Sequence, residues 1–249
     1  MLIPVSIVIV TKDEEANIEG ALAGAKDAAE IIVIDAFSTD RTIEICKKYT
    51  DKVFQKEWQG YARQKQAAVD AASGPWVLIL DADERLTPEL SEEIKKAVSE
   101  NKHNGFYLPR KNFFAGKWIR HGGWWPDHTL RLFKKDAGHV EEREVHEKVV
   151  VKGSVSFLKN PLEHYTYNSI SDYIKRMDNY SALAAKELKK TGKTPNPFSL
   201  IVRPPAAFIK MYFLRLGFMD GVEGLLLASL YSFYTFLKYA KTWEMSSKN

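Results

Sequence analysis

Apolar runs alternate with amphipathic stretches over the first hundred residues of the chain. The apolar runs predict short strands buried on both faces, as in a parallel sheet, at 5–10, 31–34, 53–54 and 76–80. The amphipathic stretches predict helices at 14–25, 42–49, 60–72 and 88–101, the last capped by Thr87. This alternation predicts an α/β fold with an open, mostly parallel, doubly wound sheet flanked by helices.

The pattern changes after residue 105, where short strands, glycines and aromatic residues follow one another to about residue 162. This stretch predicts a sheet edge with long loops, which is a suitable place for a second substrate. Ser171 and Gly192 mark the expected start and stop of an amphipathic helix. We therefore expect an α/β domain in two halves, an amphipathic helix and an apolar helical hairpin, at 1–103 and 104–165, 166–192 and 193–249.

Acidic residues stand directly after the apolar runs, at Asp13, Asp35, Asp81 and Asp83. The carboxyl ends of parallel strands line the ligand crevice of such a sheet, so we expect these carboxylates to share one cleft. The tripeptide Asp81-Ala82-Asp83 offers hard oxygen ligands for Mg²⁺ or Mn²⁺, whose coordination substrate phosphates often complete. The alternative is a solvated turn that caps the next helix, but the position after a buried strand favours a divalent ion bound with a diphosphate.

Composition and charge exclude several classes of protein. The 249 residues include 36 lysines and arginines against 32 acidic residues, without a basic stripe, so no nucleic-acid partner is expected. The single cysteine, Cys46, cannot form an internal disulfide and suits a reducing, cytoplasmic compartment. Neither a secretory signal nor a membrane-spanning helix is expected, because no uncharged apolar stretch reaches about 20 residues. No G-x-G-x-x-G follows the first strand, which excludes a dinucleotide oxidoreductase.

The chain resembles the family 2 inverting glycosyltransferases with the GT-A fold in three ordered segments, PVSIVIVTKDEE, IIVIDAFSTDRT and KQAAVDAASGPWVLILDADE. It also resembles a bacterial branch with lipopolysaccharide-core β-1,4-glucosyltransferases in HGGWWPDHTLRLF, VHEKV and EHYTYNSISDY. The resemblance implies a metal-dependent enzyme that moves a sugar, by the branch glucose, from a UDP-sugar to a hydroxyl of a membrane-bound glycolipid. A glycosyltransferase acting on a polyprenyl phosphate and a catalytically silent membrane scaffold are the alternatives.

The resemblance implies roles for individual residues of the donor site. Contacts to the nucleotide-sugar fall on Thr11, Asp13, Glu14, Asp35, Lys65 and Asp81. Asp35 would accept the N3–H of uracil, while Lys65 stands where the family usually carries an arginine, unless it is a plain surface charge. Ligands of the Mg²⁺ or Mn²⁺ ion fall on Asp83, with Asp81 and His146 beside it.

The resemblance also implies an acceptor side. Asp127 is expected as the general base, with Arg131 stabilising the departing diphosphate; an Asp127 that merely pairs with Arg131 is the alternative. Trp124 and Trp125 are expected to stack on the acceptor sugar, although buried packing tryptophans would show the same sequence.

The apolar segment 198–239 carries scattered lysines and arginines and a break at 217–221. This composition suits a helical hairpin lying at a membrane interface. The expectation is a peripheral protein on the inner face of the plasma membrane; packing on the α/β domain, or homo-oligomer contacts through the C-terminal helices, are the alternatives.

Overall fold

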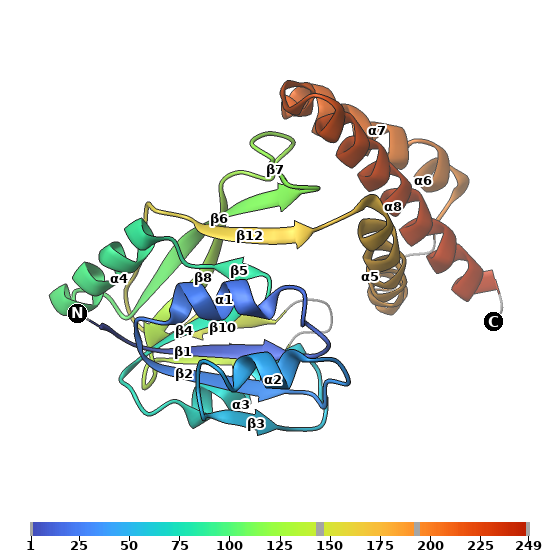
Figure 1. Cartoon of the computed structure of the whole chain (residues 1–249). Helices are drawn as coiled ribbons and strands as arrows, with labels where there is room; N and C mark the ends of the chain where they lie inside the picture. Colours follow the sequence, from blue (N-terminus) through green and yellow to red (C-terminus); the bar gives the residue numbers. More distant parts are fainter. Residues whose placement is uncertain (1, 143–146, 192–194, 248–249) are drawn as a thin grey trace. The chain divides into compact units, whose positions relative to one another are not determined.

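The computed structural model describes residues 2–142, 147–191 and 195–247, which form two compact units (Figure 1). Unit 1 comprises Met1–Arg110 and His128–His164, and unit 2 comprises Lys111–Asp127 and Tyr165–Asn249. The segment 111–127, which the sequence groups with the α/β domain, thus belongs to the same unit as the C-terminal helices.

Unit 1 is built on strands that alternate with helices as predicted. The first four strands are β1 (Ile3–Thr11), β2 (Ala28–Asp35), β3 (Val53–Gln55) and β4 (Trp76–Asp81). The helices are α1 (Ile18–Ala25), α2 (Thr42–Cys46), α3 (Tyr61–Ala71) and α4 (Pro88–Glu100). These strands lie in the order β3-β2-β1-β4 and all their pairings are parallel, so the predicted α/β class is confirmed.

Beyond β4 the sheet changes direction. Strand β8 (Asp127–Lys134) pairs antiparallel with β4, and Leu78 lies opposite Leu132. The order continues through β6 (Gly105–Phe114), β12 (Leu162–Tyr167) and β5 (Glu84–Arg85). Short strands complete this part, namely β7 (Lys117–Trp118) and β11 (Val155–Phe157) on β6 and the separate ribbon of β9 (Gly138–Glu141) and β10 (Lys148–Val151). The beginning of β8 therefore lies at the same sheet edge as the end of β4.

The sheet of unit 1 is buried on both faces, as the β-branched runs predict. In β1, Ile7 and Ile9 pack with α1 and α4 in one apolar cluster, whereas Val8 packs with α3 in another. The helices therefore cover both faces of the sheet and leave its carboxyl edge for polar side chains.

Two helix boundaries in unit 1 differ from the prediction by three or more residues. The first helix begins at Ile18 rather than at residue 14, because Asp13 has a φ of 53° and Glu14 N donates to Thr42 Oγ1 at 2.8 Å. The second helix ends at Cys46 instead of residue 49. Thr87 caps α4 as predicted, since its Oγ1 accepts from Leu90 N at 3.2 Å.

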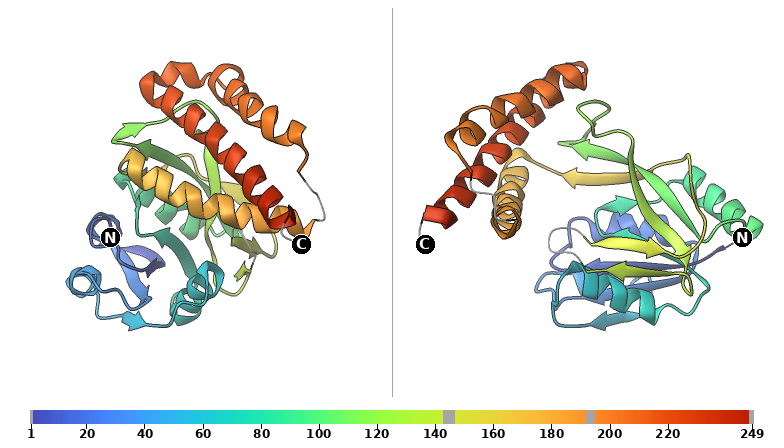
Figure 2. Two further views of the ribbon diagram at one scale, coloured as in Figure 1. Left: turned by 90° about the vertical axis from the view of Figure 1, so that its right-hand side faces the viewer. Right: turned by 180° about the vertical axis from the view of Figure 1, so that it is seen from behind.

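Unit 2 contains a hairpin of β6 and β7 and the C-terminal helices (Figure 2). These are α5 (Ile170–Lys190), α6 (Pro197–Ile201), α7 (Arg203–Ile209), the π-helical η1 (Lys210–Leu214), the 3₁₀ turn η2 (Gly217–Asp220) and α8 (Val222–Ser247). Helix α8 packs against α5 and α7, around buried residues that include Tyr173, Met211 and Leu227.

The predicted hairpin is present, with its break at residues 217–221. Ser169, not Ser171, caps α5, because its Oγ accepts from Asp172 N at 3.0 Å. The predicted stop at Gly192 lies outside the described residues. No helix in the described part of the chain combines the length and the apolar character needed to cross a bilayer.

Candidate functional site

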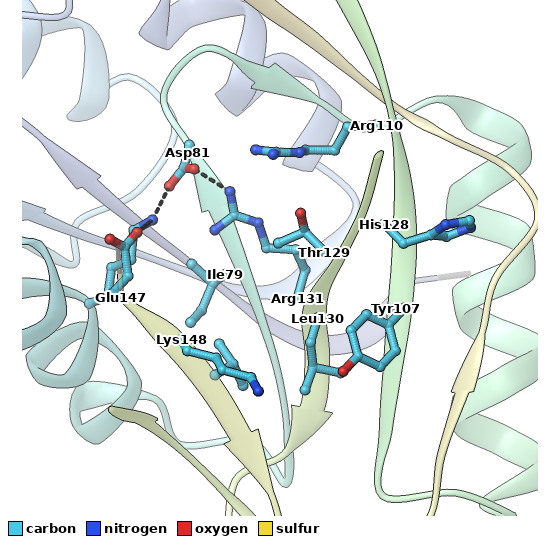
Figure 3. Close-up of a pocket in the computed structure, with 12 residues that line it drawn as sticks. Ile79, Asp81, Tyr107, Arg110, His128, Thr129, Leu130, Arg131, Glu147 and Lys148 are labelled. Atoms are coloured by element: carbon cyan, nitrogen blue, oxygen red, sulfur yellow. Dashed lines mark hydrogen bonds and ion pairs between the residues drawn. The ribbon is translucent and has the colours of Figure 1, made fainter. Parts of the chain in front are cut away.

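A cavity of about 350 Å³ opens in unit 1 beside the end of β4 (Figure 3). Its floor is apolar and includes Ile79, Leu130 and Val149. Its charged wall gathers side chains from α3, β4, β6, β8 and the approach to β10, namely Lys65, Asp81, Arg110, Arg131, Glu147 and Lys148. Four of these six side chains are cationic and two are anionic, so the cavity suits a ligand that carries negative charge.

Asp81 lies at the centre of the charged wall. Its Oδ1 lies 2.7 Å from Lys65 Nζ, and its Oδ2 is ion-paired with Arg131 (Figure 3). Burial alone would raise the pKa of Asp81, but Arg131 and Lys65 hold it well below its usual range. Asp81 is therefore a carboxylate at neutral pH, with a cation on each oxygen.

Arg131 is buried and joins two carboxylates. Its Nη2 also donates to Glu84 Oε1 at 2.8 Å, and Glu84 is fully buried. Burial alone would lower the pKa of Arg131, but the carboxylates of Asp81 and Glu84 raise it above its usual value. Within the described part of the chain, Arg131 Nε has no hydrogen-bond partner. A buried donor without a partner costs about 1–3 kcal/mol.

Lys65 is only 4% exposed, so the alternative of a plain surface charge is wrong. Besides Asp81, it pairs with Glu147, whose Oε1 lies 2.6 Å from Lys65 Nζ. Burial would raise the pKa of Glu147, but Lys65 lowers it. Arg63, on the same helix, is exposed and pairs with Glu142 at 3.3 Å. The helix therefore directs one of its two basic residues into the cavity and the other away.

The residues expected to bind the nucleotide form a hydrogen-bonded edge at the ends of β1 and β2. Asp35 accepts from Thr11 Oγ1 at 3.0 Å and from Ser38 N at 2.8 Å. Asp13 accepts from Thr39 N at 2.8 Å, and Glu14 N is held by Thr42 as described above. These bonds fix the shape of the edge.

The expectation that Asp13, Asp35, Asp81 and Asp83 share one cleft needs correction. Only Asp81 lines the cavity. Asp35 is fully buried beneath its own loop, which leaves it no surface to offer to a uracil base in this arrangement. Asp83 lies in the turn before β5, where its Oδ1 is 3.5 Å from His164 Nε2.

The residues predicted to bind a metal are not preassembled. Among the described residues, no group of three His, Cys, Asp or Glu side chains is arranged to hold an ion. Both oxygens of Asp81 bond to cations, so Asp83 is the remaining candidate ligand, and His146 lies outside the described residues. The hard oxygens of Asp83 fit Mg²⁺ or Mn²⁺, but most of the coordination would have to come from substrate phosphates and water.

Of the residues predicted for the acceptor side, Asp127, Trp124 and Trp125 belong to unit 2, whereas Arg131 belongs to unit 1. Asp127 Oδ2 accepts from Asn112 Nδ2 at 3.1 Å, and the same amide donates to Trp124 O at 3.2 Å. Trp125 meets the edge of Trp118 with ring centroids 5.4 Å apart. Both Trp124 and Trp125 are half-buried, so packing accounts for one part of each ring and another part is open to solvent.

The sequence pattern assigns no roles to Glu84 or Arg110. Glu84 follows Asp83 directly, and a carboxylate so close to a buried strand could have signalled a cationic partner. Arg110, whose Nη1 lies 3.4 Å from Glu84 Oε1, has no motif of its own. Its place in the cavity depends on the pairing of strands far apart in the sequence.

The sequence of the chain is similar to those of known glycosyltransferases. The sequence model described as Glycosyl transferase family 2 matches residues 6–164. The lipopolysaccharide core biosynthesis glycosyltransferase LpsC of Rhizobium meliloti is 29% identical over 97% of this chain and 93% of its own length. An uncharacterized glycosyltransferase of Rickettsia typhi is 31% identical over 98% of this chain and 88% of its own length.

Solved structures share the fold at low sequence identity. The S. aureus TarS fragment 1-349 in complex with UDP has a TM-score of 0.51 and 16% identity, covering 100% of this chain and 92% of that one. The mannosyltransferase PcManGT of Pyrobaculum calidifontis, in complex with GDP-Man and Mn²⁺, has a TM-score of 0.51 and 16% identity, with coverages of 100% and 89%.

Proposed function

Since this chain belongs to glycosyl transferase family 2 and is a glycosyltransferase with the GT-A fold, we propose that it moves a sugar from a UDP-sugar to a glycolipid. The observation that carries the proposal is the cavity at the end of β4, where four cationic side chains face two carboxylates. A diphosphate supplies both the negative charge and the acceptor oxygens that such a cavity lacks.

The donor is proposed to be UDP-glucose. The UDP bound to TarS supports the nucleotide, and the resemblance to lipopolysaccharide-core glucosyltransferases supports the sugar. In the proposal, Thr11, Asp13 and Glu14 shape the edge on which the nucleoside lies, and buried Asp35 holds that edge together. Lys65 and Arg131 bind the diphosphate beside Asp81.

The reaction is proposed as a single displacement. Asp127 accepts the proton of an acceptor hydroxyl while that oxygen forms a bond to C1 of the donor sugar. The bond between C1 and the diphosphate oxygen breaks, its electron pair leaves with UDP, and the configuration at C1 inverts. Arg131 and Lys65 stabilise the charge that develops on the leaving diphosphate.

A divalent ion would be held by Asp83 and would neutralise part of the diphosphate charge. The Mn²⁺ in the complex of PcManGT with GDP-Man supports such an ion.

The acceptor is proposed to be a membrane-bound glycolipid of the lipopolysaccharide-core type, which the similarity to LpsC supports. Half-buried Trp124 and Trp125 would place part of their rings against the acceptor sugar. The proposed place of action is the cytoplasmic face of the plasma membrane.

Binding of UDP tests the cavity directly. Lys65→Met removes one cation but keeps the aliphatic stem, and it should weaken UDP binding about tenfold or more, because a charge-assisted hydrogen bond is worth about 1.5–3 kcal/mol. The measurement is titration calorimetry with and without Mn²⁺. The matched control is Arg63→Met, which removes an exposed charge from the same helix. Equal UDP affinity of the Lys65 variant and the control would contradict the proposal.

Turnover tests the role of Asp127. Asp127→Asn should lower kcat for transfer to a sugar hydroxyl by a factor of about 10²–10⁴, as for loss of a general base. UDP affinity should stay the same, which shows that the variant is folded. Unchanged kcat would instead favour a polyprenyl phosphate acceptor, because a phosphate is already an anion and needs no base.

A further inference from the structure

Unit 2 exposes a concentrated set of large apolar side chains between α7 and α8. We define the apolar turn as residues 209–222. Leu214 is 75% exposed and Val222 is 68% exposed. Exposed apolar residues usually occur singly on a protein surface, whereas those of the apolar turn are concentrated in one short segment. The exposed large apolar residues of the turn are Ile209, Phe213, Leu214, Leu216, Phe218, Met219 and Val222.

The backbone of the apolar turn is firmly held. Asp220 Oδ2 accepts from His121 N at 2.8 Å, and Asp220 O accepts from Lys117 Nζ at 2.7 Å. Gly224 packs against Gly217 so closely that a Cβ on residue 224 would lie 1.8 Å from Gly217 O. The apolar side chains therefore project from a fixed scaffold, and their exposure does not come from loose packing.

The exposed charges of the apolar turn are basic. Within residues 209–222, the basic residues are Lys210 and Arg215, both of them exposed. The acidic residue of the turn, Asp220, is 4% exposed, and its carboxylate accepts from His121 N at 2.8 Å. Glu223, directly after the turn, is 31% exposed and ion-paired with Lys117 at 2.7 Å. The surface thus combines apolar side chains with a net positive charge.

We propose that the apolar turn docks on a membrane whose headgroups are anionic. A lipid interface accounts for both features at once, because it buries apolar side chains and attracts lysine and arginine. A second copy of this chain would bring the same positive charges together, which disfavours that occupant. The inference rests on the proposed function only for the location of the acceptor.

Vesicle binding tests the proposal with the full chain. Wild-type protein should sediment with vesicles that contain phosphatidylglycerol, more weakly with pure phosphatidylcholine, and less as salt is raised. The double variant Leu214→Glu with Phe218→Glu should lower the partition coefficient about tenfold or more, because two inserted side chains are lost and like charge is added.

Trp243→Glu provides the matched control. Trp243 is also exposed, but it lies in α8 about 30 Å along the helix from Val222. The control should bind vesicles like the wild type, and both variants should keep the thermal unfolding and UDP affinity of the wild type.

Three results would overturn the proposal. The first is a wild-type chain that does not bind anionic vesicles, and the second is a double variant that binds them like the Trp243 control. A dimer that the double variant dissociates, without vesicle binding, would assign the turn to a second copy and also overturn it. UDP affinity is measured on the same samples. Wild-type protein that binds anionic vesicles but not UDP would contradict the proposed function and leave the docking proposal standing.

Discussion

Phe37 has an uncommon backbone conformation at the edge of the sheet. Its φ is 56° although it is bulky, and half of the residue is exposed. Ser38 N donates to Asp35 Oδ2 at 2.8 Å and Ala36 N donates to Thr11 O at 2.9 Å, on either side of it. These hydrogen bonds keep the loop in a conformation that costs a non-glycine residue about 1–2 kcal/mol.

Replacement of Phe37 should reveal that cost. Phe37→Gly is expected to exceed Phe37→Ala in free energy of unfolding by about 1 kcal/mol, because glycine adopts positive φ without a clash. Urea unfolding of the two variants measures the difference. The control is Ala67→Gly inside α3, where the same change should destabilise by about 1 kcal/mol. If Phe37→Ala were as stable as Phe37→Gly, the loop would not be strained.

Three residues singled out from the sequence, Lys65, Asp81 and Arg131, line the cavity, but their surroundings were not predicted. Lys65 stands on an amphipathic helix, and its local sequence fits a surface charge equally well. Its burial follows from Asp81 and Glu147, which reach it from a strand and from the approach to β10. No local spacing reports such a meeting, so Glu84 and Arg110 were missed for the same reason. Asp35 was singled out correctly as a strand-end carboxylate, but its complete burial depends on the loop above it.

At the scale of elements, Glu30 of β2 joins three parts of unit 1. Its carboxylate accepts from Ser6 Oγ of β1 and, at 2.9 Å, from Ser73 N before β4, and it is ion-paired with Lys52 before β3. Burial would raise the pKa of Glu30, but Lys52, Ser6 and Ser73 lower it to about 2. The amino-terminal edge of the parallel strands therefore depends on an ionised carboxylate.

Acid should weaken the hydrogen bonds and the ion pair of the Glu30 carboxylate. Because the folded-state pKa lies below the ordinary value of 4.5, the stabilisation is complete above pH 4.5 and is lost as the pH falls towards 2. Glu30→Gln should lower the free energy of unfolding by about 1–3 kcal/mol at pH 7 and by much less near pH 2–3. Urea unfolding across this range measures it, with exposed Glu19→Gln as the control. Equal pH slopes for wild type and Glu30→Gln would contradict the assignment.

The elements themselves were the most predictable level of the structure. Buried runs with β-branched residues located β1, β2 and β4, since a strand covered on both faces has a distinctive composition. Boundaries moved where side chains of another loop intervened, as when Thr42 holds Glu14 outside α1. The antiparallel β8 was not predicted, because its direction is set by pairing with β4 and not by its own residues.

At the scale of the whole molecule, the two compact units do not follow the order of the chain. Each unit contains two separated stretches of sequence, so the chain passes from unit 1 to unit 2 and back before its C-terminal helices. Sequence order alone predicts consecutive domains and places 111–127 with its neighbours. The hydrophobic pattern does not reveal that the chain enters unit 2 at residue 111 and leaves it again, because aromatic residues and glycines occur within residues 111–127 and on both sides of them.

Arg131, which pairs with Asp81 and Glu84, stands about fifty residues after them in the chain. During synthesis on a ribosome, the first four strands emerge while these two acids still lack their guanidinium group. A nascent chain that closed its sheet early would enclose Glu84 without Arg110 or Arg131, and Asp81 with Lys65 but without Arg131, at a cost of several kcal/mol. The order of translation therefore delays completion of the interior until the antiparallel strand has left the exit tunnel, and the chamber for the donor is among the last parts of that half to take shape.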